Sequence, residues 1–426
     1  MIELVSNQLV FRFPEIHPEC SLTVTLHRTL RIPDDGREYP LPPSLGHFPM
    51  VHVDDHSSRA PKKWLGRGGI AIPMWQSEAM WIQFNPSQVI GRASPWPFAV
   101  RVACGKVSAV TGKVWSKKLL VDDYVVCPLQ PWLDGFVTDE GQIKQFVAAP
   151  LGLGATVEGQ VTKKEEFGGL QIEVIPMNLS EYDKRYPYAP PFQTHRSILR
   201  GVGSSNTLYG STTITNSLSG NIGSLGTHIY ANNSIGTCTT TGSTGVLGSK
   251  GPTSDYWEGG SSLCSNDLSV RSINTCMLSA VDNMTLKDPE VALDMGMGMG
   301  GRMKQQIFKD PYGLKTWSKK HTSRVFIHMC NSLGWRYLTG LEPSTVPLTA
   351  SDYTARGFAW FHYYEENASS LKGTETLKKV KSVAEYSKKK KIPILPENQP
   401  AHVTIGQTLM IQSKNLGKVR SGSWAK

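Results

Sequence analysis

The stretch from residue 122 to residue 177 constrains the fold more than any other part of the chain. Short runs of β-branched and aromatic residues alternate there with turn-forming residues. Apolar and polar positions also alternate within a run, and successive side chains of a strand point to opposite faces. We therefore expect an antiparallel sheet that is buried on one face. The predicted hairpins join residues 136–138 to 142–147, through a turn at 139–141, and residues 156–162 to 169–175.

The whole chain predicts a mainly β protein, a β-rich α+β fold with few short helices. Its 426 residues exceed the usual size of a single core, so we expect two antiparallel, sandwich- or barrel-like lobes. Residues 201–249 contain no Asp, Glu, Lys or Arg, which is typical of a flexible insertion. The predicted divisions are a β-rich lobe at 1–195, a Gly/Ser/Thr-rich insertion at 196–261, a second β-rich lobe with an aromatic C-terminal window at 262–365, and a basic tail at 366–426.

Hydropathy and cysteine content indicate a soluble, cytoplasmic protein. No window approaches the ~18 consecutive apolar residues that a membrane helix needs, so we expect no transmembrane segment. The first residues lack the basic region and apolar block of a secretory signal. Seven scattered cysteines contain no C-x-x-C pair, so neither a zinc site nor a disulfide framework is indicated.

Positive charge is concentrated at the C-terminal end. Residues 371–426 hold 12 Lys+Arg and 3 Asp+Glu, a net charge of +9 out of +10 for the whole chain. A basic amphipathic helix is expected over 371–386. We predict that this tail docks on an anionic partner, either a nucleic acid or an anionic membrane surface. Its predicted anion-binding residues are Lys388, Lys389, Lys390 and Lys391.

Arg302 is a further candidate for anion binding because it follows the glycine-rich run at 295–301. Glycines can expose backbone N–H groups to a phosphate. The run lacks the residue order of a phosphate loop, however, and methionines separate its glycines. A close crossing of two backbones or a buried turn is therefore the favoured interpretation.

His52, Asp54 and His56 form the densest group of potential metal ligands. On a strand they would share one face, and two imidazoles with a carboxylate could bind a divalent transition metal. The same residues also fit a polar turn or a helix cap, since Asp and Ser are common there. A divalent metal is therefore a hypothesis with an ordinary structural alternative.

Two further groups suggest catalysis. Glu78 and Asp134 could serve as general acid and base if the fold brings them together. His328, Cys330 and Asn331 supply the residue types of a nucleophilic triad, but closeness in sequence is not triad geometry. We favour buried packing for this second group.

Aromatic residues supply the candidates for contact with a protein partner or for self-association. Trp132 could lie at the rim of a sheet or plug a tight turn, and the second interpretation is favoured. The window from 349 to 364 is the most aromatic part of the chain. The predicted interaction residues are Trp132, Tyr353, Trp360 and Tyr363.

Six segments carry a resemblance to a known family, at residues 28–36, 69–81, 131–135, 301–307, 310–314 and 360–364. They are similar to a family of uncharacterised bacterial proteins that automated annotation sometimes labels integral membrane proteins. The resemblance spans both predicted lobes and omits the insertion and the lysine run. It implies no established activity and therefore no catalytic residues, and its membrane label conflicts with the hydropathy.

The preferred interpretation is a soluble, β-rich structural or binding module that docks on an anionic partner through its basic tail. The alternative is an enzyme with a pocket between the two lobes, using metal or acid–base chemistry.

Overall fold

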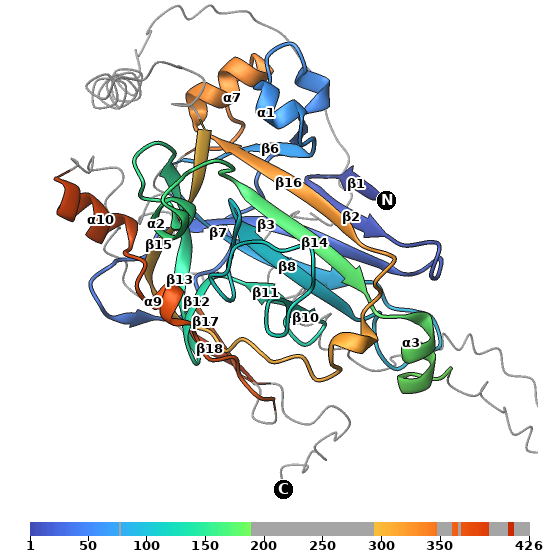
Figure 1. Ribbon diagram of the computed structural model, residues 1–426. Coiled ribbons are helices and arrows are strands. Elements are labelled where there is room, and N and C mark those ends of the chain that lie inside the picture. Colours follow the sequence, from blue (N-terminus) through green and yellow to red (C-terminus); the bar gives the residue numbers. More distant parts are fainter. Residues whose placement is uncertain (76–77, 189–293, 347–359, 365–367, 392–407, 413–426) are drawn as a thin grey trace, which may run out of the picture.

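The structure is a computed structural model that describes residues 1–75, 78–188, 294–346, 360–364, 368–391 and 408–412 (Figure 1). The predicted insertion at 196–261 and Tyr353 lie outside the described residues. The described strands form a sixteen-stranded, mostly antiparallel sheet and a separate two-stranded sheet. The prediction of a mainly β fold with few short helices is therefore confirmed.

The large sheet has a main path of ten strands. They are β1 (Ile2–Val5), β2 (Gln8–Arg12), β3 (Ser21–Leu30), β7 (Glu78–Pro86), β8 (Phe98–Cys104), β10 (Val125–Cys127), β13 (Gln142–Pro150), β14 (Leu170–Pro176), β15 (Asp294–Lys304) and β16 (Ser323–Cys330). Their order is β1-β2-β3-β7-β13-β15-β16-β14-β8-β10. The shorter strands beside this path are β4 (Glu38–Tyr39), β5 (Val51–His52), β6 (Ile70–Pro73), β9 (Val107–Ser108), β11 (Trp132–Leu133) and β12 (Gly135–Asp139).

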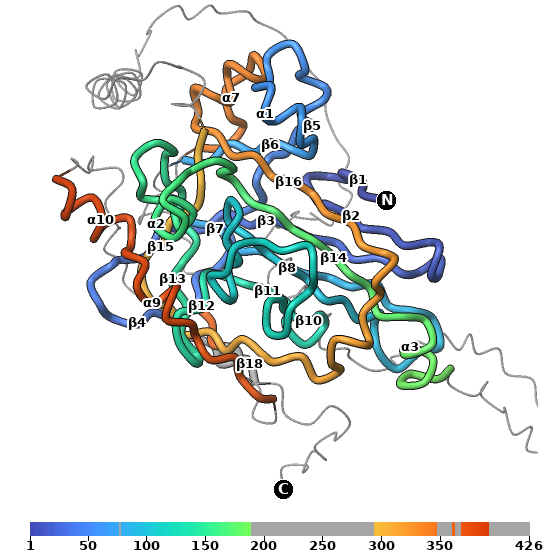
Figure 2. Tube along the Cα trace, in the orientation of Figure 1, coloured from blue at the N-terminus to red at the C-terminus, as the bar shows by residue number. Residues whose placement is uncertain are grey.

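The sheet bends so that one part of it packs against another. In Figure 1, β14 and β16 cross in front of β3 and β7, and Figure 2 shows the same crossing along the chain trace. Alternate residues of these strands meet in a single apolar core, which includes Val24, Ile82, Val174 and Ile327. Burial of this shared core is what holds the two parts of the sheet together.

Short helices lie around the sheet. The α-helices are α1 (Lys62–Leu65), α2 (Val157–Thr162), α3 (Leu179–Arg185), α7 (Ser332–Thr339), α9 (Glu375–Lys378) and α10 (Val383–Lys390), and the 3-10 helices are η1 (Asp54–His56) and η2 (Leu314–Thr316). None of the helices in the described part of the chain has the length and apolar character required to cross a lipid bilayer.

The predicted division into two separate β lobes differs from the arrangement of the described strands. β15 and β16 come from the predicted second lobe, yet β15 pairs with β13 and β16 pairs with β14 and β6. Residues 294–304 and 323–330 are thus strands of the same sheet as residues 1–176. The strand β17 (Trp360–Tyr364) pairs in parallel with β18 (Thr408–Gln412) in the small sheet.

One of the two predicted hairpins is confirmed. β12 and β13 pair around the turn at Asp139–Gly141. The other prediction is wrong in its first strand, because residues 157–162 form α2. Thr156 begins this helix, and its Oγ1 accepts a hydrogen bond from the Gly159 N–H at 3.0 Å. A side-chain cap of this kind stabilises a helix although its β-branched residues favour a strand.

The glycine-rich run forms most of β15 rather than a phosphate loop. Its methionines are buried in the core, and its glycines face the other side of the strand. A Cβ at Gly301 would lie 2.2 Å from the carbonyl oxygen of Pro33, so only glycine fits there. A Cβ at Gly298 would lie 2.3 Å from Val383 of α10. The prediction of a close backbone crossing is confirmed.

The first part of the predicted basic tail is packed on the sheet. Leu371, Leu377 and Val380 are buried in the main core. The predicted continuous helix over 371–386 is wrong, because the segment forms α9 and α10 with Lys379–Ser382 between them. The bridge between Met299 and Ser382 holds the start of α10 against β15.

Candidate functional site

The candidate site for an anionic partner is the end of α10. Lys388, Lys389 and Lys390 lie in the last turn of this helix and Lys391 follows it, and all four are exposed. We call these four residues the lysine cluster. Cations at this end of a helix are stabilised because the last carbonyl groups carry partial negative charge. The predicted residues Lys388–Lys391 are therefore gathered at one helix terminus.

The other end of α10 is held by a capping box. Ser382 Oγ accepts a hydrogen bond from the Glu385 N–H at 3.0 Å, and the Glu385 carboxylate accepts one from the Ser382 N–H at 2.9 Å. This reciprocal pair satisfies backbone donors that the first helical turn leaves open. The helix is therefore anchored at its start and presents its lysines at its end.

The lysine cluster has an excess of positive charge around it. Residues 368–391 contain eight lysines and two glutamates, a net charge of +6. Lys378 is neutralised by Asp139, at 3.0 Å. Within the described residues, by contrast, no carboxylate lies within ion-pair distance of a lysine of the cluster. The four ammonium groups are thus available to an external anion.

The apolar side of α10 is already used by the protein. Val383 packs against Gly298 of β15, and Ser387 is buried. In Figure 1, α10 lies beside β15 at the margin of the sheet. What α10 presents to solvent is therefore mainly charge.

Arg302 lies apart from the lysine cluster, on β15. Its neighbours in register are Lys144 on β13 and Glu38 on β4. It is exposed, but it sits on a regular strand and not in a loop whose N–H groups surround an anion. The phosphate-loop hypothesis for Arg302 is therefore not supported by the local backbone.

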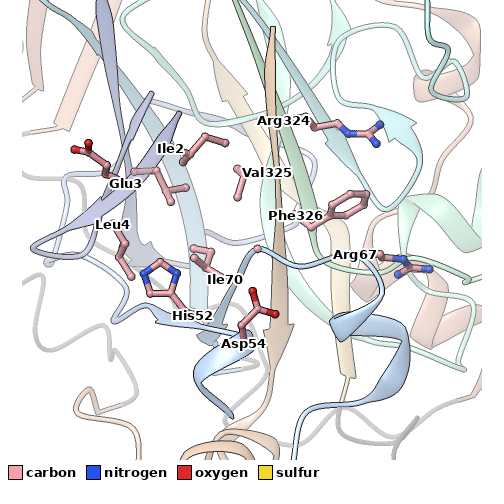
Figure 3. Close-up of a pocket in the computed structure, with 12 residues that line it drawn as sticks. Ile2, Glu3, Leu4, His52, Asp54, Arg67, Ile70, Arg324, Val325 and Phe326 are labelled. Atoms are coloured by element: carbon pink, nitrogen blue, oxygen red, sulfur yellow. The ribbon is translucent and has the colours of Figure 1, made fainter. Parts of the chain in front are cut away.

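A second candidate site is a pocket of about 220 Å³, which we call the seam pocket (Figure 3). It lies between β1 and β16, and β5, β6 and the segment around them close its other side. Its lining residues are Ile2, Glu3, Leu4, Leu9, His52, Asp54, Arg67, Gly69, Ile70, Arg324, Val325 and Phe326. Its volume is below the roughly 300–1,000 Å³ of typical small-molecule sites, so it has room for one or two side chains.

Two of the three predicted metal ligands, His52 and Asp54, line the seam pocket, but His56 is not among its lining residues. The premise of a shared strand face is wrong, because β5 ends at His52 and η1 begins at Asp54. Among the residues that the structure describes, no three His, Cys, Asp or Glu side chains are grouped so that they could hold a metal. The polar turn is the interpretation that the backbone supports.

Glu78 is buried in an ion pair with Arg28. The Arg28 Nε–H donates to Glu78 Oε1 at 3.0 Å, and the Trp75 N–H donates to Oε2 at 3.2 Å. Burial raises the pKa of Glu78 to about 7, although the charge and hydrogen bonds of Arg28 act to lower it. Each oxygen of this carboxylate is held by a neighbouring group, as in a structural ion pair.

Asp134 is buried beside Gln305. The Gln305 side chain donates to Asp134 Oδ2 at 2.8 Å, and the Asp134 N–H donates to Gln305 Oε1 at 3.1 Å. Burial raises the pKa of Asp134 to about 8. In the described part of the chain, no hydrogen bond joins Asp134 to Glu78, and neither lines the seam pocket. The acid–base hypothesis stays a prediction.

The residues of the suggested triad have separate structural roles. His328 donates to the Gly68 carbonyl at 2.9 Å and stacks on Trp64, and burial lowers its pKa to about 4. Burial raises the pKa of the Cys330 thiol. Asn331 Oδ1 accepts from an N–H of α7 at 2.8 Å and caps that helix. The expectation of buried packing fits this arrangement.

Two of the four predicted aromatic contact residues, Trp132 and Trp360, are buried. Trp132 and Trp360 are each only 2% exposed, so neither can form the expected contact without rearrangement of the fold. Trp132 is a buried residue of β11, close to the predicted aromatic plug. Tyr363 lies in β17, where it pairs in register with Ile411. Tyr353 lies outside the described residues.

Apart from His52 and Asp54, the residues that line the seam pocket are not among the predicted site residues. In residues 324–327, charged or aromatic side chains alternate with aliphatic ones, which predicts a strand with two different faces. That signal was available, but nothing in it links Arg324 to the distant residues Ile2 and Leu4. The pocket exists only because β1 and β16 meet in the folded chain.

Comparisons of the chain with protein-family models, curated proteins and solved structures find no match. The resemblance to a bacterial family stays a prediction. The lysine cluster and the seam pocket are therefore the features of the molecule from which a function can be inferred.

Proposed function

We propose that this chain is a soluble, cytoplasmic, β-rich binding module that docks on the phosphate backbone of a nucleic acid through the lysine cluster. The observation that carries the proposal is the group of four exposed lysines, without ion-pair partners among the described residues, at the end of an anchored helix. Binding of this kind gains free energy from release of the counterions that surround the phosphates, and it needs little shape complementarity.

A nucleic acid fits α10 better than a membrane surface does. A helix that binds in the membrane interface inserts an apolar face between lipids. The apolar side of α10 packs on β15 instead, through Val383 at Gly298, and Ser387 is buried as well. A cytoplasmic location is supported by Cys20, Cys104, Cys127 and Cys330, which are free thiols.

The proposal is tested by measuring the affinity of the full-length protein for labelled DNA and RNA oligonucleotides over a series of salt concentrations. Replacement of all four cluster lysines by glutamine should weaken binding by about tenfold or more. The plot of log affinity against log salt concentration has a negative slope, and this slope should become less steep by roughly 2–4 in the variant. Fluorescence anisotropy provides both quantities.

The matched control replaces four other exposed lysines by glutamine, at Lys117, Lys118, Lys319 and Lys320. It has the same net charge as the cluster variant, so it separates a local site from general attraction to a basic protein. Equal loss of affinity in the two variants contradicts the proposal. Binding to vesicles that contain phosphatidylserine, without binding to nucleic acid, assigns the cluster to a membrane surface instead.

A further inference from the structure

The seam pocket borders the edges of two strands. Three consecutive residues of β1, Ile2–Leu4, line it, and so do three consecutive residues of β16, Arg324–Phe326. Successive side chains of a strand point to opposite faces. A pocket lined by three in a row therefore lies along the edge of the strand, not over one face. Figure 3 shows these two groups on opposite sides of the pocket.

β1 has unpaired backbone groups on the side away from β2. The backbones of Met1 and Arg12 exchange two hydrogen bonds, at 3.0 Å and 2.9 Å. Along an antiparallel ladder such pairs alternate with pairs whose N–H and C=O groups point outward. Ile2 and Leu4 occupy the outward positions of this register. No described strand other than β2 pairs with β1.

The first half of β16 has a similar free edge. β14 pairs with one side of it, from Ser323 to Ile327, whereas β6 pairs with the other side only from Ile327 onward. A Cβ at Gly69 would lie 2.1 Å from the Phe326 carbonyl oxygen, so this oxygen points toward the β6 side. Backbone groups two residues apart point the same way. Those of Arg324 therefore face the part of this edge that β6 leaves open.

Apolar side chains line the inner side of the seam pocket. Ile2 and Leu4 pair in register with core residues of β2 and pack against the main core. Ile70 and Val325 are buried on the opposite side. A segment that enters along the edge of β1 would therefore place an apolar side chain between these walls.

Positive charge lies on the outer side of the seam pocket. Arg324 is exposed, and its guanidinium is 5.1 Å from the centre of the Phe326 ring. It has no ion pair with a carboxylate among the described residues. Glu3, the acidic residue on β1, is neutralised by Arg12 at 2.9 Å. An acidic side chain of a binding partner could thus pair with Arg324.

We infer that β1 takes up an extended peptide segment of a protein partner by antiparallel strand addition, with apolar residues facing the seam pocket and acidic residues facing Arg324. The free N–H and C=O groups of β1 supply the affinity, as in other complexes where a peptide extends a sheet. The pocket supplies the specificity for alternate side chains. This surface is separate from the lysine cluster and does not depend on the nucleic-acid proposal.

The register predicts which amides of the peptide matter. Ile2 and Leu4 face inward, and residues that exchange backbone hydrogen bonds have side chains on the same face. The apolar residues of the peptide therefore direct their N–H groups to β1, and the acidic residues direct theirs away. The probe is a synthetic peptide of alternating valine and glutamate. One derivative is N-methylated at each valine and a second at each glutamate.

Isothermal titration calorimetry with the full-length protein tests the inference. The parent peptide and the glutamate-methylated peptide should bind alike, and methylation of the valines should abolish binding. Arg324→Glu should weaken binding by about tenfold or more, because it places like charges together. Arg37→Glu, at an exposed arginine outside the pocket lining, should leave affinity unchanged.

Three outcomes overturn the inference. The first is equal binding of both methylated peptides, which shows that β1 is not the hydrogen-bonding partner. The second is equal binding of a valine–lysine peptide, which removes the role of Arg324. The third is a dimer in analytical ultracentrifugation that Arg324→Glu dissociates, since a second copy of this chain then occupies the edge. A thermal unfolding curve of each variant verifies that it is folded.

Discussion

Two parts of the same sheet differ in how completely the edges of their strands are covered by other elements. β15 is covered closely: β13 pairs along almost its whole length, and α10 approaches so tightly that a Cβ at Gly298 would contact Val383. At the seam pocket, β1 and the first half of β16 each have one edge without a strand partner in the described part of the chain. The first region is closed by packing, and the second is open.

The difference follows from the side chains that each region carries. Glycines on one face of β15 remove the bulk that would keep α2 and α10 away, while methionines fill the core on the other face. The open edges carry charged residues, Glu3 and Arg324. Charges at a strand edge discourage unselective pairing with other chains. A closed region of this kind stabilises the fold, and a charged open edge is suited to a selective partner.

The largest expected effect comes from adding bulk to the closed region. Gly301→Ala should lower the free energy of unfolding by about 2–3 kcal/mol, because the new Cβ would lie 2.2 Å from the Pro33 carbonyl oxygen. Urea denaturation measures this change. Gly66→Ala is the control, since its Cβ would meet its nearest atom, the Lys62 carbonyl oxygen, at an ordinary 3.5 Å. Equal destabilisation of the two variants would show that β15 is not tightly covered.

The next effect is a pH dependence of stability next to the closed region, where Asp134 is buried beside Gln305, the residue that follows β15. Burial raises the pKa of Asp134 from 3.8 to about 8. Between these values the folded state binds more protons than the unfolded state, so stability falls as the pH rises. From pH 6 to pH 8 this residue should cost about 2 kcal/mol of unfolding free energy.

Asp134→Asn removes this titration and keeps an oxygen that can accept from Gln305. The difference in unfolding free energy between pH 6 and pH 8 should therefore be smaller in the variant than in the wild type. Urea denaturation at the two pH values gives the comparison, and other titrating groups cancel in it. An unchanged pH dependence would mean that Asp134 ionises in the folded protein at its ordinary pKa.

A smaller effect is expected where α10 meets β15. Val383→Ala should destabilise the protein by about 1 kcal/mol, because it removes methyl groups that pack at Gly298. It should also loosen the helix, so that trypsin cleaves faster at the lysine cluster. Val121→Ala, at an exposed valine, is the control. If trypsin cleaves the wild type as fast as it cleaves Val383→Ala, the contact between Val383 and Gly298 does not hold α10 in place.

The smallest effect on stability is expected at the open edge. Arg324→Ala should change the free energy of unfolding by less than about 0.5 kcal/mol, since the side chain is exposed and lacks an ion pair among the described residues. Thermal denaturation measures this. A loss comparable to that of Gly301→Ala would mean that Arg324 supports the fold and is not reserved for a partner.

The sequence predicts the local parts of this fold better than the distant ones. The hairpin of β12 and β13 follows from alternation and a glycine turn, both of which act over a few residues. Residues 156–162 also contain β-branched side chains, but the Thr156 cap and the surrounding contacts select a helix. Secondary-structure preference is weak enough for such contacts to override it.

The candidate sites also differ in whether their residues are close together or far apart in the sequence. The lysine cluster is visible in the sequence because its four residues are consecutive. The seam pocket is not, because it needs Ile2–Leu4 and Arg324–Phe326, which are far apart in the sequence, to meet in the folded chain. The roles of buried residues such as Glu78 also depend on distant partners, in this case Arg28. A local sequence pattern predicts neither the seam pocket nor the ion pair between Glu78 and Arg28.

Amide hydrogen exchange, resolved to single residues, tests the contrast between the closed and the open region most directly. We expect the amides of Leu4 and Arg324 to exchange nearly as fast as those of an unstructured chain, while those of Val147 and Gly298, which pair with each other between β13 and β15, exchange only when the protein unfolds. Protection of Leu4 and Arg324 equal to that of Val147 and Gly298 would contradict this expectation.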